Sequence, residues 1–443
     1  MTDIIALLQC VDKTLNKTTL RQLTIIVTAI LSMTGRVTML GISRWAGAGG
    51  SYRTVQRFFN SSIVWRKLNW LLIRQWLNEE DETLLIAGDE TMITKAGKAT
   101  YGLDRFFSSL FGKPVPGLAF FALSLISVKR HRSAVVLMEQ LTKEQATTRK
   151  AAIQSAGKDK PKSKRKRGRP KGSQNKNQRD VDLPVHLQQI QKLLIELLAL
   201  VGVQAKLAYC VLDGAFGNNN ALQMVRRCGL HLISKLRCDA ALYLPYDGPQ
   251  KKQGPRCKYG QRLDYHNLPD RCCVDTKIEG KIRTDIYQMQ VWHKKFPDLL
   301  NVVVIVKVNL ITHQRAHVIL FSSDLSLIWP TLVDYYRLRF QIEFNSRDAK
   351  QYWGLEDFMN VNQLPVYNAA NLAMFMVNLS QALVQQMQPR IPEFSVNDLK
   401  AHFRGRRYVQ ETLKFLPLPP EPFLIEELFA KVGILGGIHP PAT

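Results

Sequence analysis

The amino-acid sequence predicts an α/β protein with a mixed sheet, interrupted by a strand-rich insertion and flanked by helical regions at both ends. Short apolar runs of strand length alternate with amphipathic helical segments, such as Val185–Val201, in the middle of the chain. Residues 1–80 and 361–443 instead carry apolar residues at helical spacing. A polar stretch at 238–326, punctuated by Pro and Gly, contains further strand patterns and divides the α/β core.

Composition indicates a folded protein with an anionic partner. The chain has 443 residues, of which 46% are hydrophobic, and this length suits about three domains. Lys and Arg number 61 against 36 Asp and Glu, a net charge of +25, which favours nucleic acid as the partner. A membrane surface is the competing interpretation, but no apolar run approaches the ~20 residues that span a bilayer. Because the start shows no secretory pattern, we expect a cytoplasmic, nucleoid-associated protein.

Other common site types are disfavoured by missing motifs. The seven cysteines include no CxxC pair, which argues against a disulfide framework or a structural zinc site. The sequence contains no HExxH pattern and no GxxxxGK(S/T) phosphate loop. We therefore expect neither a zinc hydrolase nor a nucleotide cofactor.

Residues 1–80 are predicted to form a helical, DNA-binding region. Within it, the stretch from Ser43 to Phe59 has the pattern of a helix, a glycine turn and a second helix. Ser51 can cap the second helix, which places Arg53 and Arg57 on one side of it. This arrangement is compatible with a helix-turn-helix that contacts DNA. A helical hairpin that merely exposes its arginines is the alternative.

The first part of the α/β core, residues 81–237, contains two strands that end at an acid. Thr83–Gly88 is apolar and is followed by Asp89, and Lys206–Leu212 is apolar and is followed by Asp213. If these strands are neighbours, both carboxylates lie at one end of the sheet. Each acid taken alone is equally typical of a cap or a turn.

A basic segment at 158–179 interrupts this core. It holds eleven Lys or Arg residues and one Asp with almost no apolar side chain, so we expect a solvated, flexible loop. Its sequence KRGRPKG, with Arg167, Arg169 and Lys171, resembles an AT-hook, in which an extended Gly-Arg-Pro core lies in the DNA minor groove. A generic phosphate-binding basic segment is the alternative, and both predict contact with nucleic acid.

The stretch YRLRFQIEFNSRDAK presents a lone carboxylate among cations. On one α-helix, Tyr336, Arg339, Glu343 and Lys350 fall within roughly a 60° arc, and Arg347 joins them within about a further 20°. An apolar stripe runs beside this face, so the predicted helix packs on a core and exposes the Glu in a basic field. A charged, solvated helix face is the ordinary alternative.

Asp89, Asp213 and Glu343 together suit a metal-dependent phosphoryl-transfer site. Three carboxylates can hold two hard Mg²⁺ or Mn²⁺ ions. Two such ions stabilise the entering and leaving oxygens of an in-line displacement. Because three close carboxylates repel one another, the same residues predict metal dependence.

The chain resembles the bacterial insertion-sequence DDE transposases of the insertion-sequence-four group. The spacing Tyr-x2-Arg-x3-Glu-x6-Lys of that group is matched from Tyr336 onward. The segments GDETMITKAGKATYGLDRFFSS and VLDGAFGN resemble its first and second acidic motifs. The resemblance covers roughly residues 80–360.

This resemblance implies an RNase H-like catalytic domain, with a β-strand insertion before a core helical segment, 327–360, that carries Glu343. It implies cut-and-paste DNA transposition: Mg²⁺-dependent strand cleavage at the transposon ends, followed by transfer of the 3′-OH into target DNA. The three acids would be both catalytic and metal-binding. The transposon-end phosphates would be contacted by Tyr336, Arg339 and Lys350.

The resemblance also bears on partners. Double-stranded DNA, as terminal repeats and as target, is the expected partner, and a homodimer is expected in the synaptic complex. The helical region 361–443 is the candidate dimer contact, with simple packing against the core as its alternative. Some relatives hold a flipped base with a Trp of the insertion, for which Trp292 and Trp329 are candidates, although core packing is the alternative for both. A catalytically inactive, transposase-derived DNA-binding protein is the alternative function.

Overall fold

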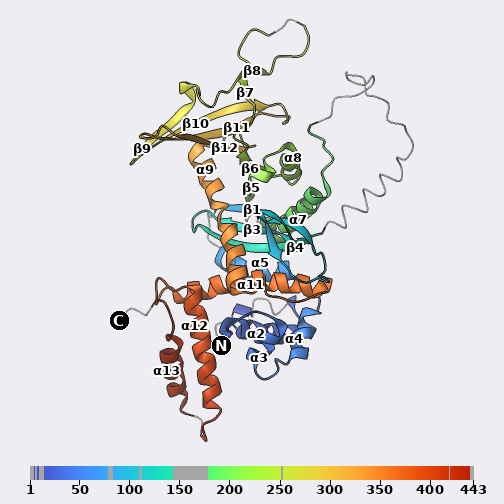
Figure 1. Ribbon diagram of the computed structural model, residues 1–443, viewed down its shortest axis with the longest axis vertical. Helices are drawn as coiled ribbons and strands as arrows, with labels where there is room; N and C mark the ends of the chain where they lie inside the picture. The colour runs from blue at the N-terminus through green and yellow to red at the C-terminus, as the bar shows by residue number, and fades with distance from the viewer. Residues whose placement is uncertain are drawn as a thin grey trace, which may run out of the picture.

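A computed structural model of the chain describes residues 4, 7–8, 14–77, 83–108, 112–142, 178–250, 253–418 and 420–439. These residues form an elongated body, with the N-terminal helices and the last two helices at one end and the strand-rich insertion at the other (Figure 1). The predicted basic loop at 158–179 lies outside the described residues except for its last two. Its candidate DNA contacts Arg167, Arg169 and Lys171 are therefore not described.

The centre of the molecule is one mixed sheet, to which twelve strands of the described chain belong. The strands are β1 (Leu84–Thr94), β2 (Asp104–Ser108), β3 (Lys113–Ser127), β4 (Arg132–Leu141), β5 (Leu207–Leu212), β6 (His231–Leu236), β7 (Leu242–Pro245), β8 (Tyr259–Arg262), β9 (Cys273–Glu279), β10 (Ile282–His293), β11 (Leu300–Asn309) and β12 (Arg315–Ser322). Their order is β2-β3-β1-β5-β6-β12-β11-β10-β7-β8, with β4 also paired to β3 and β9 to β10.

The core of this sheet confirms the predicted fold class. β1, β3 and β4 pair antiparallel, whereas β5 is parallel to β1 and β6 is parallel to β5. These five strands form a mixed sheet, as the sequence predicts. The inserted strands do not form a separate sheet, because β12 pairs antiparallel with β6 and continues the core sheet outward.

Helices cover both faces of the core sheet. They are α2 (Lys17–Ser32), α3 (Met39–Ala46), α4 (Tyr52–Phe59), α5 (Trp65–Leu77), α7 (Val185–Val201), α8 (Asn219–Arg227), α9 (Trp329–Leu338), α10 (Gln341–Tyr352), α11 (Gln363–Met387), α12 (Val396–Leu413) and α13 (Pro422–Gly433). Alternate residues of β1 separate two cores: Leu85 and Ala87 pack with α9, α10 and α11, and Ile86 packs with α7 and α8. No helix in the described part is long and apolar enough to cross a membrane.

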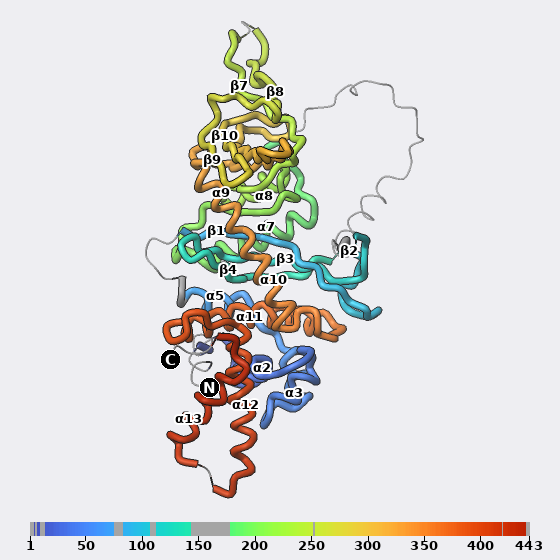
Figure 2. The backbone as a smooth tube through the Cα atoms, turned by 60° about the vertical axis from the view of Figure 1, so that its left-hand side comes forward, coloured from blue at the N-terminus to red at the C-terminus, as the bar shows by residue number. Residues whose placement is uncertain are grey.

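Buried amide side chains on α11 hold the sheet. This helix lies across the molecule between the sheet and the N-terminal helices (Figures 1 and 2). Asn378 is fully buried; its Nδ2 donates to the Val135 carbonyl at 2.7 Å and to Asn69 Oδ1 at 2.9 Å, and its Oδ1 accepts from the Val135 N–H at 3.2 Å. These bonds connect the backbone N–H and C=O of Val135, which is in register with Ser124 of β3, to a side chain of α11.

A second buried amide joins α11 to the N-terminal helices. Asn368 Nδ2 donates to the carbonyls of Phe59 and Ser61, each at 2.8 Å, in the turn after α4. Its Oδ1 accepts from Trp65 Nε1 at 2.8 Å at the start of α5. Because all these groups are buried or nearly so, each bond also removes a desolvation penalty.

Two details of the predicted elements are wrong. The single helix expected to carry Tyr336 to Lys350 is two helices, α9 and α10, that meet at Arg339 and Phe340. There the N–H groups of Phe340, Ile342 and Glu343 bond three residues back instead of four, which bends the chain. Asp89 does not follow its strand but lies inside β1, because apolar alternation continues through Ile93 after the fully buried run ends.

We predict that Asn378→Ala lowers the free energy of unfolding by about 2–4 kcal/mol, because the buried Val135 N–H and C=O groups lose their partners. Urea denaturation followed by circular dichroism measures this change. Asn362→Ala is the matched control, since Asn362 is exposed and makes no side-chain cap bond at the start of the same helix. Equal effects of the two substitutions would contradict the role assigned to the buried amide.

Candidate active site

Two of the three predicted acids lie at matching positions along two adjacent parallel strands. Gly88 of β1 is in register with Leu212, the last residue of β5, so Asp89 within β1 and Asp213 directly after β5 occupy the next position along each segment. Parallel neighbours are about 4.8 Å apart. Asp89 also lies two residues beyond Ala87, and Asp213 two beyond Val211, on the face that packs with α9 and α10. The sheet therefore presents both carboxylates toward these helices.

Local bonds fix the turn that carries Asp213. Its Oδ1 accepts from the Ala215 N–H at 3.1 Å and caps a short 3-10 helix, while its carbonyl accepts from Ser234 Oγ at 2.6 Å. Gly217 closes the turn against β6, where an added Cβ would come within 2.1 Å of the Lys235 carbonyl oxygen. A glycine is therefore required there, and the DGAFG sequence serves both the turn and the acid.

Glu343 reaches this edge from the first turn of α10. Arg339, at the bend before α10, donates from Nη2 to Glu343 Oε1 at 2.7 Å. The Arg339 side chain is only 12% exposed, and within the described chain its buried Nε has no hydrogen-bond partner. Its guanidinium carbon also lies 5.9 Å from the Tyr336 ring centroid. The structure thus brings Tyr336, Arg339 and Glu343 together.

Buried amides also hold α10 in place. Asn345, two residues after Glu343, is buried and donates from Nδ2 to Ser133 Oγ of β4 at 2.8 Å. Its Oδ1 accepts from Gln381 Nε2 of α11 at 3.3 Å. The helix that carries the third acid is therefore bonded to both the sheet and α11.

The three carboxylates interact electrostatically. Burial raises the pKa of Asp89 from 3.8 to about 6; the Arg339 charge opposes this rise, and the charges of Glu343 and Asp213 add to it. Burial also raises the pKa of the neighbouring Glu90, with a contribution from Asp213. A carboxyl group whose pKa is raised by burial and by neighbouring negative charges is typical of a functional site. Glu90 was not singled out from the sequence.

The donor set fits a divalent cation in charge and chemistry, because carboxylate oxygens are the ligands that Mg²⁺ and Mn²⁺ prefer. The side chains do not enclose such an ion as they stand: among the described residues, no group of three or more His, Cys, Asp or Glu is placed to hold a metal. Glu343 is instead paired with Arg339. Only Oε1 of Glu343 takes part in that ion pair, so Oε2 is not engaged by Arg339.

A basic cavity of about 490 Å³ opens beside Asp213. Lys235 and Arg237, at the end of β6, line it together with Tyr336 and Arg339. Such a cationic wall next to carboxylates suits a phosphodiester. Lys235 and Arg237 were missed in the sequence, although two cations at the end of the strand that follows Asp213 were a usable signal.

The remaining basic residues of the predicted helix face do not reach the acids. Lys350 Nζ donates to the Met92 carbonyl of β1 at 2.7 Å and lies 3.4 Å from Glu356 Oε1. Arg347 pairs with Asp348 at 3.1 Å, and its guanidinium carbon lies 4.7 Å from the Phe344 ring centroid. Only part of the predicted basic field therefore surrounds Glu343.

The N-terminal arginines lie apart from this site. Helices α3 and α4 flank the glycine turn, and Ser51 caps α4 by accepting from the Thr54 N–H at 3.3 Å. Arg53 and Arg57 are exposed on α4, in the helical region at the end of the molecule opposite the insertion (Figure 1). Their predicted contact with DNA stays a prediction.

Neither candidate tryptophan adjoins the acids. Trp292 of β10 pairs with Tyr243 of β7, and its ring meets that of Tyr259 with centroids 6.1 Å apart. Four strand spacings separate β10 from β5, which amounts to roughly 19 Å. Trp329 begins α9 seven residues before Tyr336, about 10 Å along the helix axis. Both pack within the insertion and its junction with α9.

Comparisons with known proteins give one family. A family model described as DDE superfamily endonuclease matches residues 7–296, a span that includes Asp89 and Asp213 and ends before Glu343. Among solved structures, the piggyBac transposase synaptic complex with hairpin DNA is similar, with a TM-score of 0.39 and 12% identity over 94% of this chain and 76% of that chain. That likeness is too weak to support a functional argument. No curated protein sequence matches.

We predict that Asp89→Asn stabilises the metal-free protein at pH 7.5 by up to about 3 kcal/mol, since a carboxyl with a folded pKa of about 6 and an ordinary value of 3.8 opposes folding when ionised. The gain should shrink as the pH falls through 6 and vanish below about 4, where both states are protonated. Thermal melting in EDTA between pH 4 and 8 measures it.

The control for this prediction is Asp247→Asn, since Asp247 is exposed in a loop of the insertion. It should show no pH-dependent gain. Added Mg²⁺ should narrow the difference between the wild type and Asp89→Asn. A gain that is the same at every pH would refute the electrostatic explanation.

Proposed function

This chain belongs to the DDE superfamily endonucleases, and we propose that it is a DNA transposase that cuts DNA at transposon ends and transfers the 3′-OH into target DNA. The single observation that carries this proposal is the juxtaposition of Asp89 within β1 and Asp213 directly after the adjacent strand β5, with Glu343 near enough to raise the pKa of Asp89. Membership of the insertion-sequence-four group is part of the proposal and rests on the spacing from Tyr336 to Lys350.

Asp89, Asp213 and Glu343 would hold two Mg²⁺ or Mn²⁺ ions. When bound, such ions stabilise negative charge on the attacking and leaving oxygens of a phosphodiester. The residues themselves supply the negative charge that selects divalent cations, and Asp89 must be ionised to do so. Its raised pKa implies that cation binding and loss of the Asp89 proton are coupled.

Arg339 would exchange partners when DNA binds. In the DNA-free chain its guanidinium holds Glu343, and its buried Nε–H has no acceptor within the described residues. A phosphate oxygen could accept from this group and replace the carboxylate, since Arg binds carboxylate and phosphate with the same planar fork. The released Glu343 could then join the two aspartates.

DNA is proposed to run across the basic cavity. Lys235 and Arg237 would contact phosphates on the insertion side of Asp213, and Tyr336 and Arg339 belong to the same cavity lining. Arg53 and Arg57 of α4 and the basic segment at 158–179 would contact more distant DNA. These contacts would supply most of the affinity and make it depend strongly on salt.

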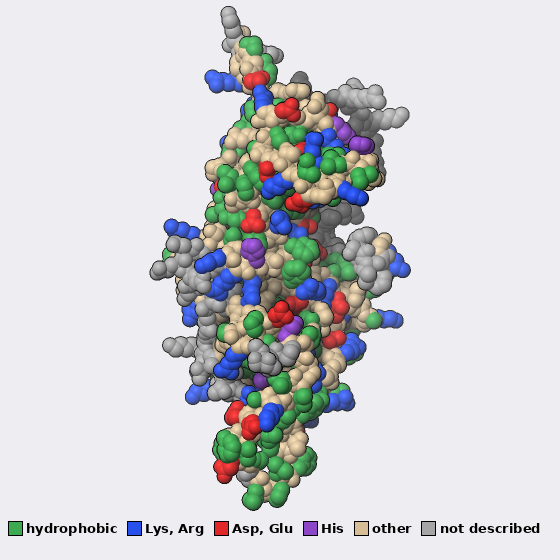
Figure 3. Space-filling view, turned by 90° about the vertical axis from the view of Figure 1, so that its left-hand side faces the viewer, with side chains coloured by type: hydrophobic (Ala, Val, Ile, Leu, Met, Phe, Trp, Pro, Cys, Tyr) green, Lys and Arg blue, Asp and Glu red, His purple; other side chains and the backbone are tan. Residues whose placement is uncertain are grey.

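We also propose that the chain acts as a homodimer. Joining two DNA ends needs two sets of acids, and one chain supplies one proposed set. The α12–α13 region exposes several large apolar side chains: Phe415 (87% exposed), Leu418 (79%) and Phe423 (67%) in and after the turn between the two helices, and Leu435 (67%) after α13. Hydrophobic side chains gather at the lower end of the molecule in Figure 3, the end at which α12 and α13 lie in Figure 1. An apolar group of this kind is typical of a protein interface.

The alternative is an inactive, transposase-derived DNA-binding protein. The observation in its favour is that, in the described part of the chain, the carboxylates do not enclose a metal and Glu343 is paired with Arg339. Such a protein would keep the basic surfaces and lose strand cleavage. Cleavage assays separate the two functions.

We predict that the wild-type protein nicks or cuts plasmid DNA carrying its own gene with flanking sequence, in Mg²⁺ but not in EDTA. Asp89→Asn should lower the cleavage rate more than about 100-fold, because losing a metal ligand exceeds the effect of losing an outer partner. DNA affinity, measured by fluorescence anisotropy in Ca²⁺, should change less than about threefold. Asp247→Asn is the control. Equal cleavage by Asp89→Asn and wild type would refute the assignment.

We predict that replacing Phe423 and Leu435 together by Asp weakens self-association at least about tenfold, because burying a carboxylate in an apolar contact is unfavourable. Light scattering after gel filtration, with and without end DNA, measures the molar mass. Val203→Asp is the matched control, since Val203 is fully exposed on the opposite face of the core beside α7. A dimer that survives the double substitution would place the interface elsewhere.

A further inference from the structure

Lys350 connects the two elements that carry Asp89 and Glu343. It lies seven residues after Glu343, two turns along α10, and its Nζ donates to the Met92 carbonyl at 2.7 Å. Met92 lies three residues after Asp89 on β1. The Lys350 side chain is 31% exposed, and its Nζ also lies 3.4 Å from Glu356 Oε1. Its ammonium donors therefore face the strand and the segment after α10.

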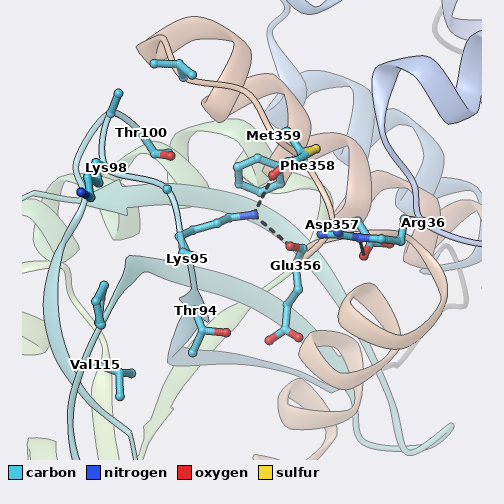
Figure 4. Close-up of a pocket in the computed structure, with 15 residues that line it drawn as sticks. Arg36, Thr94, Lys95, Lys98, Thr100, Val115, Glu356, Asp357, Phe358 and Met359 are labelled. Atoms are coloured by element: carbon cyan, nitrogen blue, oxygen red, sulfur yellow. Dashed lines mark hydrogen bonds and ion pairs between the residues drawn. The ribbon is translucent and has the colours of Figure 1, made fainter.

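A second lysine makes a parallel connection from β1. Lys95 follows the last residue of β1, and its Nζ donates to the carbonyls of Glu356 at 2.9 Å and Phe358 at 2.8 Å (Figure 4). The same Nζ lies 3.6 Å from the centroid of the Phe358 ring. Burial lowers the pKa of Lys95 to about 8, which indicates an ammonium group withdrawn from water to make these bonds.

The segment that both lysines reach is anchored to the N-terminal helices as well. Asp357 accepts from the Val37 N–H at 2.9 Å and from Arg36 Nε at 3.3 Å. Gly354 has a φ of +77°, and an added Cβ would lie 2.3 Å from Val37 Cβ, so only glycine fits this contact. Residues 354–358 are thus fixed between β1, α10 and the segment that precedes α3.

We propose that Lys350 and Lys95 are positioning residues that set the separation between Asp89 on β1 and Glu343 on α10, rather than contacts to DNA. Metal ligands must be placed within about 0.2 Å, so a small slide of α10 along β1 would separate the acids. Two carbonyl-bound ammonium groups resist that slide. A phosphate would have to share these ammonium groups with the Met92, Glu356 and Phe358 carbonyls.

This inference rests on the proposed function, and it differs from the signature-based expectation for Lys350. A DNA contact and a positioning contact have different signatures. Neutralising a phosphate contact lowers the slope of log affinity against log salt by about one. Loosening α10 against β1 leaves that slope unchanged and weakens metal binding in the absence of DNA.

The experiment compares Lys350→Met with wild type in three measurements: Mn²⁺ affinity of the DNA-free protein by electron paramagnetic resonance, the salt dependence of DNA affinity, and the melting temperature. We expect Mn²⁺ affinity to fall about 10–100-fold, as for other residues that orient metal ligands. The salt slope should be unchanged. Lys350→Arg should recover most of the Mn²⁺ affinity, because a guanidinium can still donate to the Met92 carbonyl.

Three variants calibrate the measurements. Lys192→Met removes an exposed lysine on α7 and should change nothing. Arg53→Met, in a proposed DNA contact, should lower the salt slope by about one and leave Mn²⁺ affinity unchanged. Lys95→Met should act in the same direction as Lys350→Met, and it carries the test with Lys350→Arg if Lys350→Met does not fold.

A salt slope lowered by about one with unchanged Mn²⁺ affinity would overturn the inference and make Lys350 a DNA contact. A lower melting temperature with unchanged Mn²⁺ affinity would also overturn it, because the role would then be structural only. Asp89→Asn tests the premise that Asp89, Asp213 and Glu343 form a metal site. If that substitution leaves Mn²⁺ affinity unchanged, the proposed metal site is wrong, and the positioning role is wrong with it.

Discussion

The buried amides of α11 are the constraint on which the rest of the molecule depends. Asn378 occupies the backbone groups of Val135 in β4, and Asn368 holds the turn between α4 and α5. Amide bonds of this kind are directional, so they set register where apolar packing alone would permit sliding. The sheet, the N-terminal helices and α10 are all hydrogen-bonded to α11. Their positions relative to one another, and so the distances between the three acids, are fixed by this helix.

The candidate site keeps charged groups that lower the stability of the folded chain. Burial and like charges make an ionised Asp89 unfavourable, while the positive charge of Arg339, which also pairs with Glu343, offsets part of that cost. Natural sites commonly keep such strain where a ligand will relieve it. A divalent cation and a phosphodiester together would satisfy both the carboxylates and the guanidinium. The cation could therefore take the place of Arg339 beside Glu343, and the phosphodiester could take the place of Glu343 beside Arg339.

Continuous patterns in the sequence were predictive, and interruptions were not. The strand before Asp213 was found because its sequence is an unbroken apolar run, and its last three residues, Cys210–Leu212, are buried. The extent of β1 beyond Asp89 was missed because its pattern changes from continuous to alternating. The bend at Arg339 was missed because apolar spacing continues across it. The partner of Lys350 is a backbone carbonyl, at Met92, which no side-chain pattern can report.

The segment around Asp357 connects the N-terminal helical region to the strand that carries Asp89. It receives hydrogen bonds from Val37, between α2 and α3, and from Lys95 at the end of β1, while the contact of Gly354 with Val37 leaves no room for a larger residue. Any free energy transmitted through such a joint is reciprocal. If the N-terminal helices bind DNA, metal binding at the three acids would change the affinity of these helices for DNA. Binding of a preferred DNA sequence by these helices would in turn change the affinity of the acids for metal. DNA recognition and assembly of the catalytic site would then be coupled.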